Sequence, residues 1–149
     1  MAKILDEKFV RRSIIEFLSR KGWGRNLREK ATDEHGVDIS VRHNNFNRKW
    51  LIEVKGDSQN KIKAPRSRQE VNFLLALGQI VTRMKISKGA ADYKYTKKYG
   101  VAFPLTYEKL VLRRLPWAFC HRFNLYAFFV DVDKKVRLKD WRDFKRSQQ

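Results

Sequence analysis

The sequence has little of what would mark a secreted, membrane-spanning or disulfide-bonded protein. Its single cysteine, Cys120, excludes an internal disulfide and a metal–thiolate cluster. No run of about 20 apolar residues could cross a bilayer, and the first residues lack the apolar segment of a signal peptide. The three histidines are scattered, without the spacing of a zinc site. We therefore expect a cytoplasmic protein in a reducing setting, with no membrane partner.

Acidic residues are scarce as well. The chain has 16 Asp and Glu against 34 Lys and Arg, which gives a net charge of +18. Its 149 residues, 42% hydrophobic and 13% aromatic, are enough for one globular domain with a real core. An excess of positive charge concerns partners rather than fold, and nucleic acid is the simplest partner, with an anionic membrane surface second. We predict a folded domain over residues 1–133 and a basic C-terminal tail over residues 134–149, in which Trp141 and Phe144 could act as anchors.

Two neighbouring stretches alternate between apolar and polar residues, as half-buried strands do. They cover residues 37–43 and 49–55, and residues 44–47 between them form a turn-rich Asn-Asn-Phe-Asn sequence. If a four-residue loop joins the strands, Asp38 lies opposite Glu53. A slip of one residue would send the two carboxylates to different faces, so the hydrophobic pattern fixes their pairing.

In this register Asp38, Glu53 and Lys55 share the polar face of the hairpin. Directly opposed Cβ atoms lie about 5 Å apart, so one cation could bridge both carboxylates, and the carbonyl of Val54 could be a further ligand. Hard oxygen ligands favour Mg²⁺ or Mn²⁺. The simpler alternative is that both acids are ordinary strand residues with Lys55 as their salt-bridge partner.

The remaining pattern predicts alternating helices and strands. We expect a helix over residues 6–21, a short strand over 25–32, the hairpin, and a helix from an N-cap at Ser67, with Glu70 completing a capping box, to about residue 85. A strand over 99–103, a helix from Thr106 that Pro116 interrupts, and a strand over 125–131 follow. The order α-β-β-β-α-β-α-β predicts an α/β fold with a mixed β-sheet flanked by helices on both faces.

The pattern of Asp38 followed by Glu53-Val54-Lys55 after a hairpin resembles the PD-(D/E)XK nuclease superfamily, whose fold is restriction-endonuclease-like. The resemblance covers roughly residues 6–131, and Val37 stands where the name-giving motif has proline. It implies that the Asp and Glu bind a divalent metal and that the Lys helps to position the attacking water. In this chain those roles fall on Asp38, Glu53 and Lys55.

The resemblance also implies two helper residues. Many members add a glutamate from the first helix, for which Glu16 is the best-placed candidate and Glu7 the second. Many place a glutamine on the helix after the lysine. Gln79 is the natural match, because its surroundings are similar to that segment in several small members, and Gln69 is the weaker one.

The basic residues after the hairpin and before the next strand are the candidate DNA contacts: Lys61, Lys63, Arg66, Arg68, Lys94, Lys97 and Lys98. Together these features predict a Mg²⁺-dependent (or Mn²⁺-dependent) DNA endonuclease that reads backbone or structure more than sequence. Two alternatives stay open: a nuclease fold kept only for binding DNA, and a basic assembly protein without a metal site. Cuts on both strands would suit a homodimer, but no interface is visible in the sequence.

Overall fold

The computed structural model describes residues 3–24, 37–57, 65–84 and 97–149, which form a five-stranded mixed sheet in the order β1-β2-β3-β4-β5. The strands are β1 (Ile39–Arg42), β2 (Lys49–Val54), β3 (Lys97–Pro104), β4 (Leu125–Val130) and β5 (Val136–Lys139). The three central strands run parallel, and β1 and β5 are antiparallel to their neighbours. Ligand sites of open α/β sheets lie at the carboxyl ends of parallel strands, which here are the ends of β2, β3 and β4.

One face of the sheet is covered by α1 (Glu7–Arg20). Val10, Ile14 and Leu18 recur at one-turn spacing and are fully buried among the side chains of this face. The helix begins where Asp6 caps it, because the Asp6 carboxylate accepts a hydrogen bond from the Phe9 amide at 2.8 Å. The predicted first helix is therefore confirmed.

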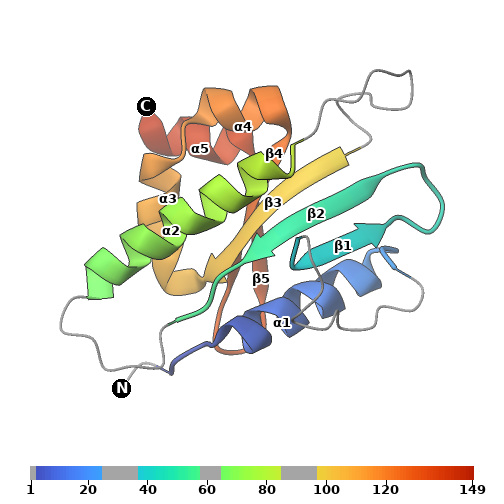
Figure 1. The fold of residues 1–149 in the computed structure, drawn as a ribbon, viewed down its shortest axis with the longest axis horizontal. Coiled ribbons are helices and arrows are strands. Elements are labelled where there is room, and N and C mark those ends of the chain that lie inside the picture. The colour runs from blue at the N-terminus through green and yellow to red at the C-terminus, as the bar shows by residue number, and fades with distance from the viewer. Residues whose placement is uncertain (1–2, 25–36, 58–64, 85–96) are drawn as a thin grey trace.

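The other face carries the remaining helices, as Figure 1 shows. They are α2 (Pro65–Thr82), the short 3₁₀ helix Leu105–Tyr107, α3 (Glu108–Arg114), α4 (Trp117–Phe123) and α5 (Trp141–Gln148). Both β2–β3 and β3–β4 are parallel pairs, and right-handed crossovers place their connecting helices on the same side of a sheet. Their core includes Phe73, Phe103 and Phe129, all fully or almost fully buried. None of the described helices is long and apolar enough to cross a membrane.

The register of the hairpin is the one that the sequence predicts. Ile39 pairs with Ile52 and Val41 with Trp50, and all four side chains are buried in the core beneath α1. Extending the ladder by one residue places Asp38 opposite Glu53. The hydrophobic pattern was thus sufficient to fix this part of the sheet.

The C-terminal segment corrects the predicted domain boundary at residue 133. Residues Val136–Lys139 form β5 and pair with β4, and Phe144 of α5 is completely buried. Residues 134–149 are therefore part of the folded domain rather than a tail. Phe144, one of the two residues predicted as possible anchors, is buried in the core, and Trp141, the other, packs against it.

Two smaller predictions were also affected by the structure. Ser67 is not an N-cap, because α2 already begins at Pro65, a residue that is favourable in the first turn of a helix. The strand predicted over residues 25–32 lies outside the described residues. The predicted break at Pro116 is confirmed, since Pro116 directly precedes α4.

Candidate active site

Asp38 and Glu53 meet at the carboxyl end of β2. Asp38 directly precedes β1, and its Oδ2 accepts a hydrogen bond from the backbone amide of Val54 at 2.8 Å. Glu53 is only 3% exposed, whereas the Asp38 side chain is 23% exposed. The pair is therefore open to solvent on the Asp38 side and closed on the Glu53 side.

The environment of Glu53 favours its protonated form. Burial, followed by the charge of Asp38 and a hydrogen bond with its carboxyl group, raises the pKa of Glu53 to about 7. Glu53 Oε1 is buried and has no hydrogen-bond partner. The Nε atom of Arg83, in the segment after α2, lies 3.7 Å from this oxygen, beyond hydrogen-bonding distance. A buried carboxylate oxygen without a partner is costly, and a cation would relieve that cost.

Lys55 follows β2 directly and is half-buried, and its backbone amide donates to the carbonyl of Ala102 at 2.9 Å. This bond continues the pairing of β2 with β3 and fixes the backbone of the lysine. The Lys55 charge lowers the pKa of both Glu7 and Glu53. The ammonium group therefore lies within electrostatic reach of Glu53, a predicted metal ligand, and of Glu7.

The glutamate that α1 brings to this site is Glu7, not Glu16. Burial and the charge of Asp38 raise the pKa of Glu7. Arg11 links the two acids: its Nη2 lies 3.4 Å from Glu7 Oε1 and 3.6 Å from Asp38 Oδ1. Glu16 instead lies 3.6 Å from Lys134 and lines a shallow depression with Arg20 and Asp131.

The tight contact between Gly56 and the start of α1 explains this correction. A Cβ atom on Gly56 would lie 2.1 Å from the backbone nitrogen of Glu7, so only glycine fits. Leu5 and Asp57 exchange two hydrogen bonds beside it, of 2.7 and 3.0 Å. The end of β2 is thus held against the first turn of α1, and Glu16 lies about 13 Å further along the helix axis.

Gln79 is exposed on α2, one helical turn before Arg83. The two residues share a helix flank, but no contact joins the Gln79 side chain to the described carboxylates. Gln69 lies elsewhere, with its Nε2 3.5 Å from the Thr106 hydroxyl. The amide that does reach the end of β2 is Asn72, whose Nδ2 lies 3.0 Å from the Tyr107 hydroxyl and 3.5 Å from the carbonyl of Gly56.

Sequence reasoning missed the two arginines of the site. Arg11 is buried, and its Nε has no hydrogen-bond partner. The available signal was its spacing of four residues from Glu7 on the same helix. Arg83 had no comparable signal, because its approach to Glu53 depends on how α2 packs against the sheet.

The donor set suits a hard divalent cation with few protein ligands. Within the described residues, no group of three or more His, Cys, Asp or Glu side chains is arranged to hold a metal. Mg²⁺ commonly uses one or two carboxylates together with water and substrate oxygens. Asp38 and Oε1 of Glu53, which has no hydrogen-bond partner, meet that requirement, and the carbonyl of Val54 lies in the chain between Glu53 and Lys55.

The predicted DNA-contact residues that the structure describes with their side chains, Arg68, Lys97 and Lys98, do not gather in one place. Lys61, Lys63 and Lys94 lie outside the described residues, as does the side chain of Arg66, and Arg68 is exposed near the start of α2. Lys97 and Lys98 begin β3, where Lys98 pairs with Trp50 rather than with the Glu53 end of β2. They are therefore at the opposite end of the sheet from the carboxylates.

Lys98 contributes to a small basic and aromatic pocket at that opposite end. Its ammonium lies 5.4 Å from the Trp50 ring centroid and 5.2 Å from that of Tyr126. Burial lowers the pKa of Lys98, and the charge of Arg48 lowers it further. The pocket has a volume of about 350 Å³. Its lining residues are Arg48, Lys98, His121, Asn124, Tyr126, Asp140, Trp141 and Arg142.

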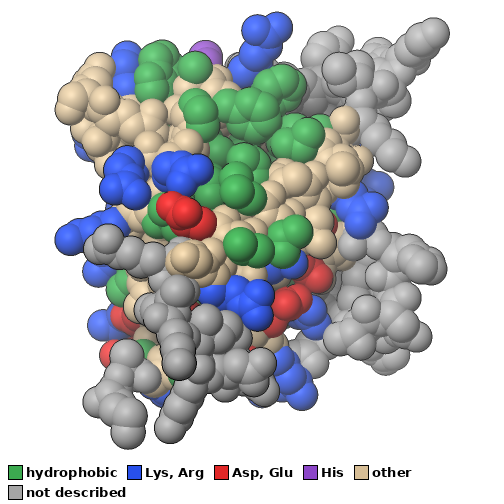
Figure 2. Space-filling view, turned by 60° about the vertical axis from the view of Figure 1, so that its left-hand side comes forward, with side chains coloured by type: hydrophobic (Ala, Val, Ile, Leu, Met, Phe, Trp, Pro, Cys, Tyr) green, Lys and Arg blue, Asp and Glu red, His purple; other side chains and the backbone are tan. Residues whose placement is uncertain are grey.

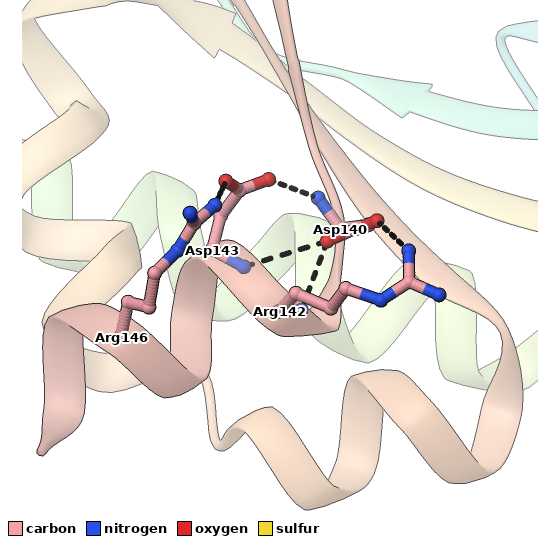
Figure 3. A network of polar contacts seen from close by, with 4 residues as sticks. All are labelled: Asp140, Arg142, Asp143 and Arg146. Atoms are coloured by element: carbon pink, nitrogen blue, oxygen red, sulfur yellow. Dashed lines mark hydrogen bonds and ion pairs between the residues drawn. The ribbon is translucent and has the colours of Figure 1, made fainter.

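The one acid of this pocket, Asp140, is already engaged. Its carboxylate accepts hydrogen bonds from the Arg142 amide and side chain and caps α5 together with Asp143 (Figure 3). Arg146 pairs with Asp143 at 2.6 Å. The charges of Lys98 and Arg48 are therefore not offset by Asp140, and the pocket suits an anion.

Comparison with known proteins identifies the fold but no family. No family model matches the sequence, and no curated protein matches it. Among solved structures, the chain is similar to an XisH family protein from Nostoc punctiforme PCC 73102, with a TM-score of 0.52 and 18% sequence identity. The likeness covers 88% of this chain and 98% of that one.

At this level of identity the likeness concerns the fold alone. The predicted fold class is confirmed: a mixed β-sheet with helices on both faces, of the restriction-endonuclease-like type. The described residues add β5 and α5 to the predicted order and divide the helix predicted from Thr106, while the strand predicted over residues 25–32 lies outside them. The likeness does not extend to an activity, a metal or a substrate.

Proposed function

We propose that the protein is a divalent-metal-dependent endonuclease that hydrolyses phosphodiester bonds in DNA. The observation that supports this most is the pairing of Asp38 with the buried Glu53, with Lys55 beside them at the end of β2. A pair of carboxylates kept close together, one of them without a hydrogen-bond partner at Oε1, costs folding free energy. Such a cost is typical of a functional site.

Asp38 and Glu53 would hold the metal, with the carbonyl of Val54 as a further donor. A bound Mg²⁺ or Mn²⁺ would polarise the phosphate and lower the pKa of a water molecule. The residues of the chain supply the other requirements. Arg11 fixes the Asp38 carboxylate from the α1 side, at 3.6 Å, and Arg83 approaches Glu53 from the α2 side, at 3.7 Å.

Lys55 would act as a positioned charge in this site. Its backbone is fixed by the hydrogen bond to Ala102, and its charge already acts on Glu53 and Glu7, so it would stabilise negative charge that develops there during the reaction. Glu7 carries a raised pKa and a side chain that is 45% exposed. It is suited to accept a proton from water or to orient water by hydrogen bonding.

DNA binding would depend mainly on the net charge of +18. Contacts to phosphates release counterions, so the affinity should fall steeply with salt. We propose backbone-directed or structure-directed recognition, since we find no recognition helix or other base-reading module among the described residues. A reducing cytoplasm would suit the buried thiol of Cys120, whose pKa burial raises to about 12.

The test is a cleavage assay with Mg²⁺ or Mn²⁺ on duplex, branched and single-stranded DNA. Asp38→Asn, Glu53→Gln and Lys55→Ala should each lower cleavage by about 100-fold or more, while salt-dependent binding survives. Glu16→Gln is the matched control and should cleave as the wild type does. A wild-type protein that leaves every substrate intact with either metal would contradict the proposal.

A second candidate is a nuclease fold kept only for binding DNA. It is favoured by the arginines: Arg11 and Arg83 already lie near Asp38 and Glu53, as they would in a purely structural charge network. This candidate predicts DNA binding that is indifferent to EDTA and no calorimetric signal for Mg²⁺. Either a metal-binding signal or cleavage would exclude it.

A further inference from the structure

The outward face of α2 is unusually apolar for an exposed helix. Val71, Leu74, Leu75 and Val81 are 46%, 53%, 50% and 42% exposed. Their spacing places them on one stripe, opposite the buried residues of the same helix. We call these four residues, together with Gly78, the α2 stripe. Figure 2 shows hydrophobic side chains gathered across one face of the molecule, with Lys and Arg mostly around its edges.

The α2 stripe is also free of charge. No Lys, Arg, Asp or Glu occurs from Val71 to Thr82, the longest such run in a chain of which 34% of residues are charged. Two copies of a protein with a net charge of +18 repel each other wherever their basic surfaces meet. The α2 stripe is a surface on which two copies could meet without bringing like charges together.

Gly78 lies at the centre of the stripe. Glycine in the interior of an exposed helix is destabilising relative to alanine, so its presence needs a reason. The described residues of a single chain offer none, because among them a Cβ atom on Gly78 would meet nothing within 4 Å. Glycine at the centre of a helix face allows another helix backbone to approach closely. A helix packed against this face would therefore explain why residue 78 is glycine.

We propose that the α2 stripe is the contact between two copies of this chain, with the two α2 helices antiparallel and crossing at Gly78. A two-fold interface must be self-complementary. In an antiparallel pair centred on Gly78, Leu74 and Leu75 of one copy lie against Thr82 and Val81 of the other, and the two uncharged runs overlap from Leu74 to Thr82. An acidic partner protein would gain nothing from a face without charge.

The dimer does not depend on nuclease activity, but it would serve it. Two copies would bring two Asp38–Glu53 pairs to one DNA molecule, one for each strand. A single helix face is small beside the roughly 800 Å² per partner of a standard interface, so the dimer is expected to be weak and concentration-dependent. Salt screens the repulsion between the copies, so salt should strengthen the dimer while it weakens DNA binding.

The test is sedimentation equilibrium of the full chain without DNA, from about 5 to about 200 µM, at low and high salt. We expect a monomer–dimer equilibrium that salt shifts toward the dimer. Leu74→Lys with Leu75→Lys should give a monomer throughout. Phe46→Lys is the control, because Phe46 is a 63% exposed apolar residue in the hairpin loop, away from the α2 stripe, and it should dimerise as the wild type does.

The Gly78→Ala variant tests whether α2 packs against the α2 helix of a second copy or is simply exposed to solvent. Alanine has room in the single chain and a higher helix propensity, so the thermal midpoint of the dilute protein should rise. The dissociation constant of the dimer should increase by about tenfold or more, because the methyl groups keep the two backbones apart. A wild-type protein that is monomeric over the whole range, or a Gly78→Ala variant that dimerises unchanged, would overturn the proposal.

Discussion

The carboxylate of Asp38 accepts a hydrogen bond at 2.8 Å from the amide of Val54, a residue sixteen positions later in the chain. This bond closes the end of the β1–β2 hairpin beyond its last paired residues. It also fixes Asp38 beside Glu53, whose pKa the Asp38 charge helps to raise. Asp38 therefore has two roles: its Oδ2 atom holds the hairpin together, and the charge of its carboxylate raises the pKa of Glu53.

Two substitutions at Asp38 should separate these roles. Asp38→Asn keeps an oxygen that can accept the hydrogen bond from Val54 but removes the charge, so stability should change little while the pKa of Glu53 falls from about 7. Asp38→Ala leaves the Val54 amide without its partner and should lower the free energy of unfolding by about 1–3 kcal/mol. Urea denaturation measures the stability, and side-chain carboxyl NMR follows the titration of Glu53. An unchanged Glu53 titration in Asp38→Asn would show that the two acids are not coupled.

Glu53 should make the metal-free protein less stable as the pH rises. In the unfolded chain its carboxyl group loses its proton near its ordinary pKa of 4.5, whereas in the folded protein it keeps the proton up to about pH 7. Between these values the folded state binds more protons, so its stability falls with increasing pH and stays lower above pH 7. Glu53→Gln cannot ionise and should be more stable than the wild type at pH 8 by roughly 1–3 kcal/mol.

The measurement is denaturation of both proteins in the presence of a chelator, at pH 5 and pH 8. The difference between them should be small at pH 5 and large at pH 8. Glu70→Gln, at an exposed position on α2 paired with Arg114, is the control and should show no such pH dependence. Equal stability of Glu53→Gln and the wild type at pH 8 would show that the ionised Glu53 carboxylate does not destabilise the folded protein.

The hairpin could be predicted because its information is local. Alternating residues decide which side chains face the core, and a short loop leaves one register, so the pairing of Ile39 with Ile52 and the meeting of Asp38 and Glu53 followed from the sequence. Helix contacts are different. Periodicity shows which face of α1 is buried, but not which turn of the helix lies over the end of β2.

That missing information explains why the sequence analysis ranked Glu16 above Glu7. The axial position of α1 is set by the close contact of Gly56 with the backbone of Glu7, which no pattern in the sequence displays. The same reasoning applies to Arg83, which reaches Glu53 only through the packing of α2. The C-terminal segment was misjudged for another reason: its many charges favoured a tail, although Phe144, already named as a possible anchor, is completely buried and holds α5 in the fold.

Glu7 and Glu16 form a matched pair for testing which glutamate of α1 takes part in the chemistry. Both lie on α1, and their side chains are 45% and 47% exposed. Glu7→Gln should lower cleavage at saturating DNA by about tenfold or more, because Glu7 shares Arg11 with Asp38. Glu16→Gln should leave cleavage unchanged.

Glu7 is also the acidic residue of the first turn of α1, so its loss carries a small stability cost of about 0.3–1 kcal/mol. Thermal denaturation beside the cleavage assay separates this cost from a catalytic effect. If Glu16→Gln lost activity and Glu7→Gln kept it, the arrangement described for α1 would be wrong.

Lys98 tests whether the pocket at the other end of the sheet contacts DNA. Burial lowers the pKa of its ammonium, which means that keeping it charged at neutral pH costs folding free energy. Lys98→Met should therefore hold or raise the thermal midpoint, yet weaken DNA binding and reduce the slope of log affinity against log salt by about one. Lys109→Met, at an exposed position of α3, is the control for a simple loss of one charge. Because Lys98 lies away from the carboxylates, cleavage at saturating DNA should be unchanged, and an affinity equal to that of the control would show that the pocket makes no phosphate contact.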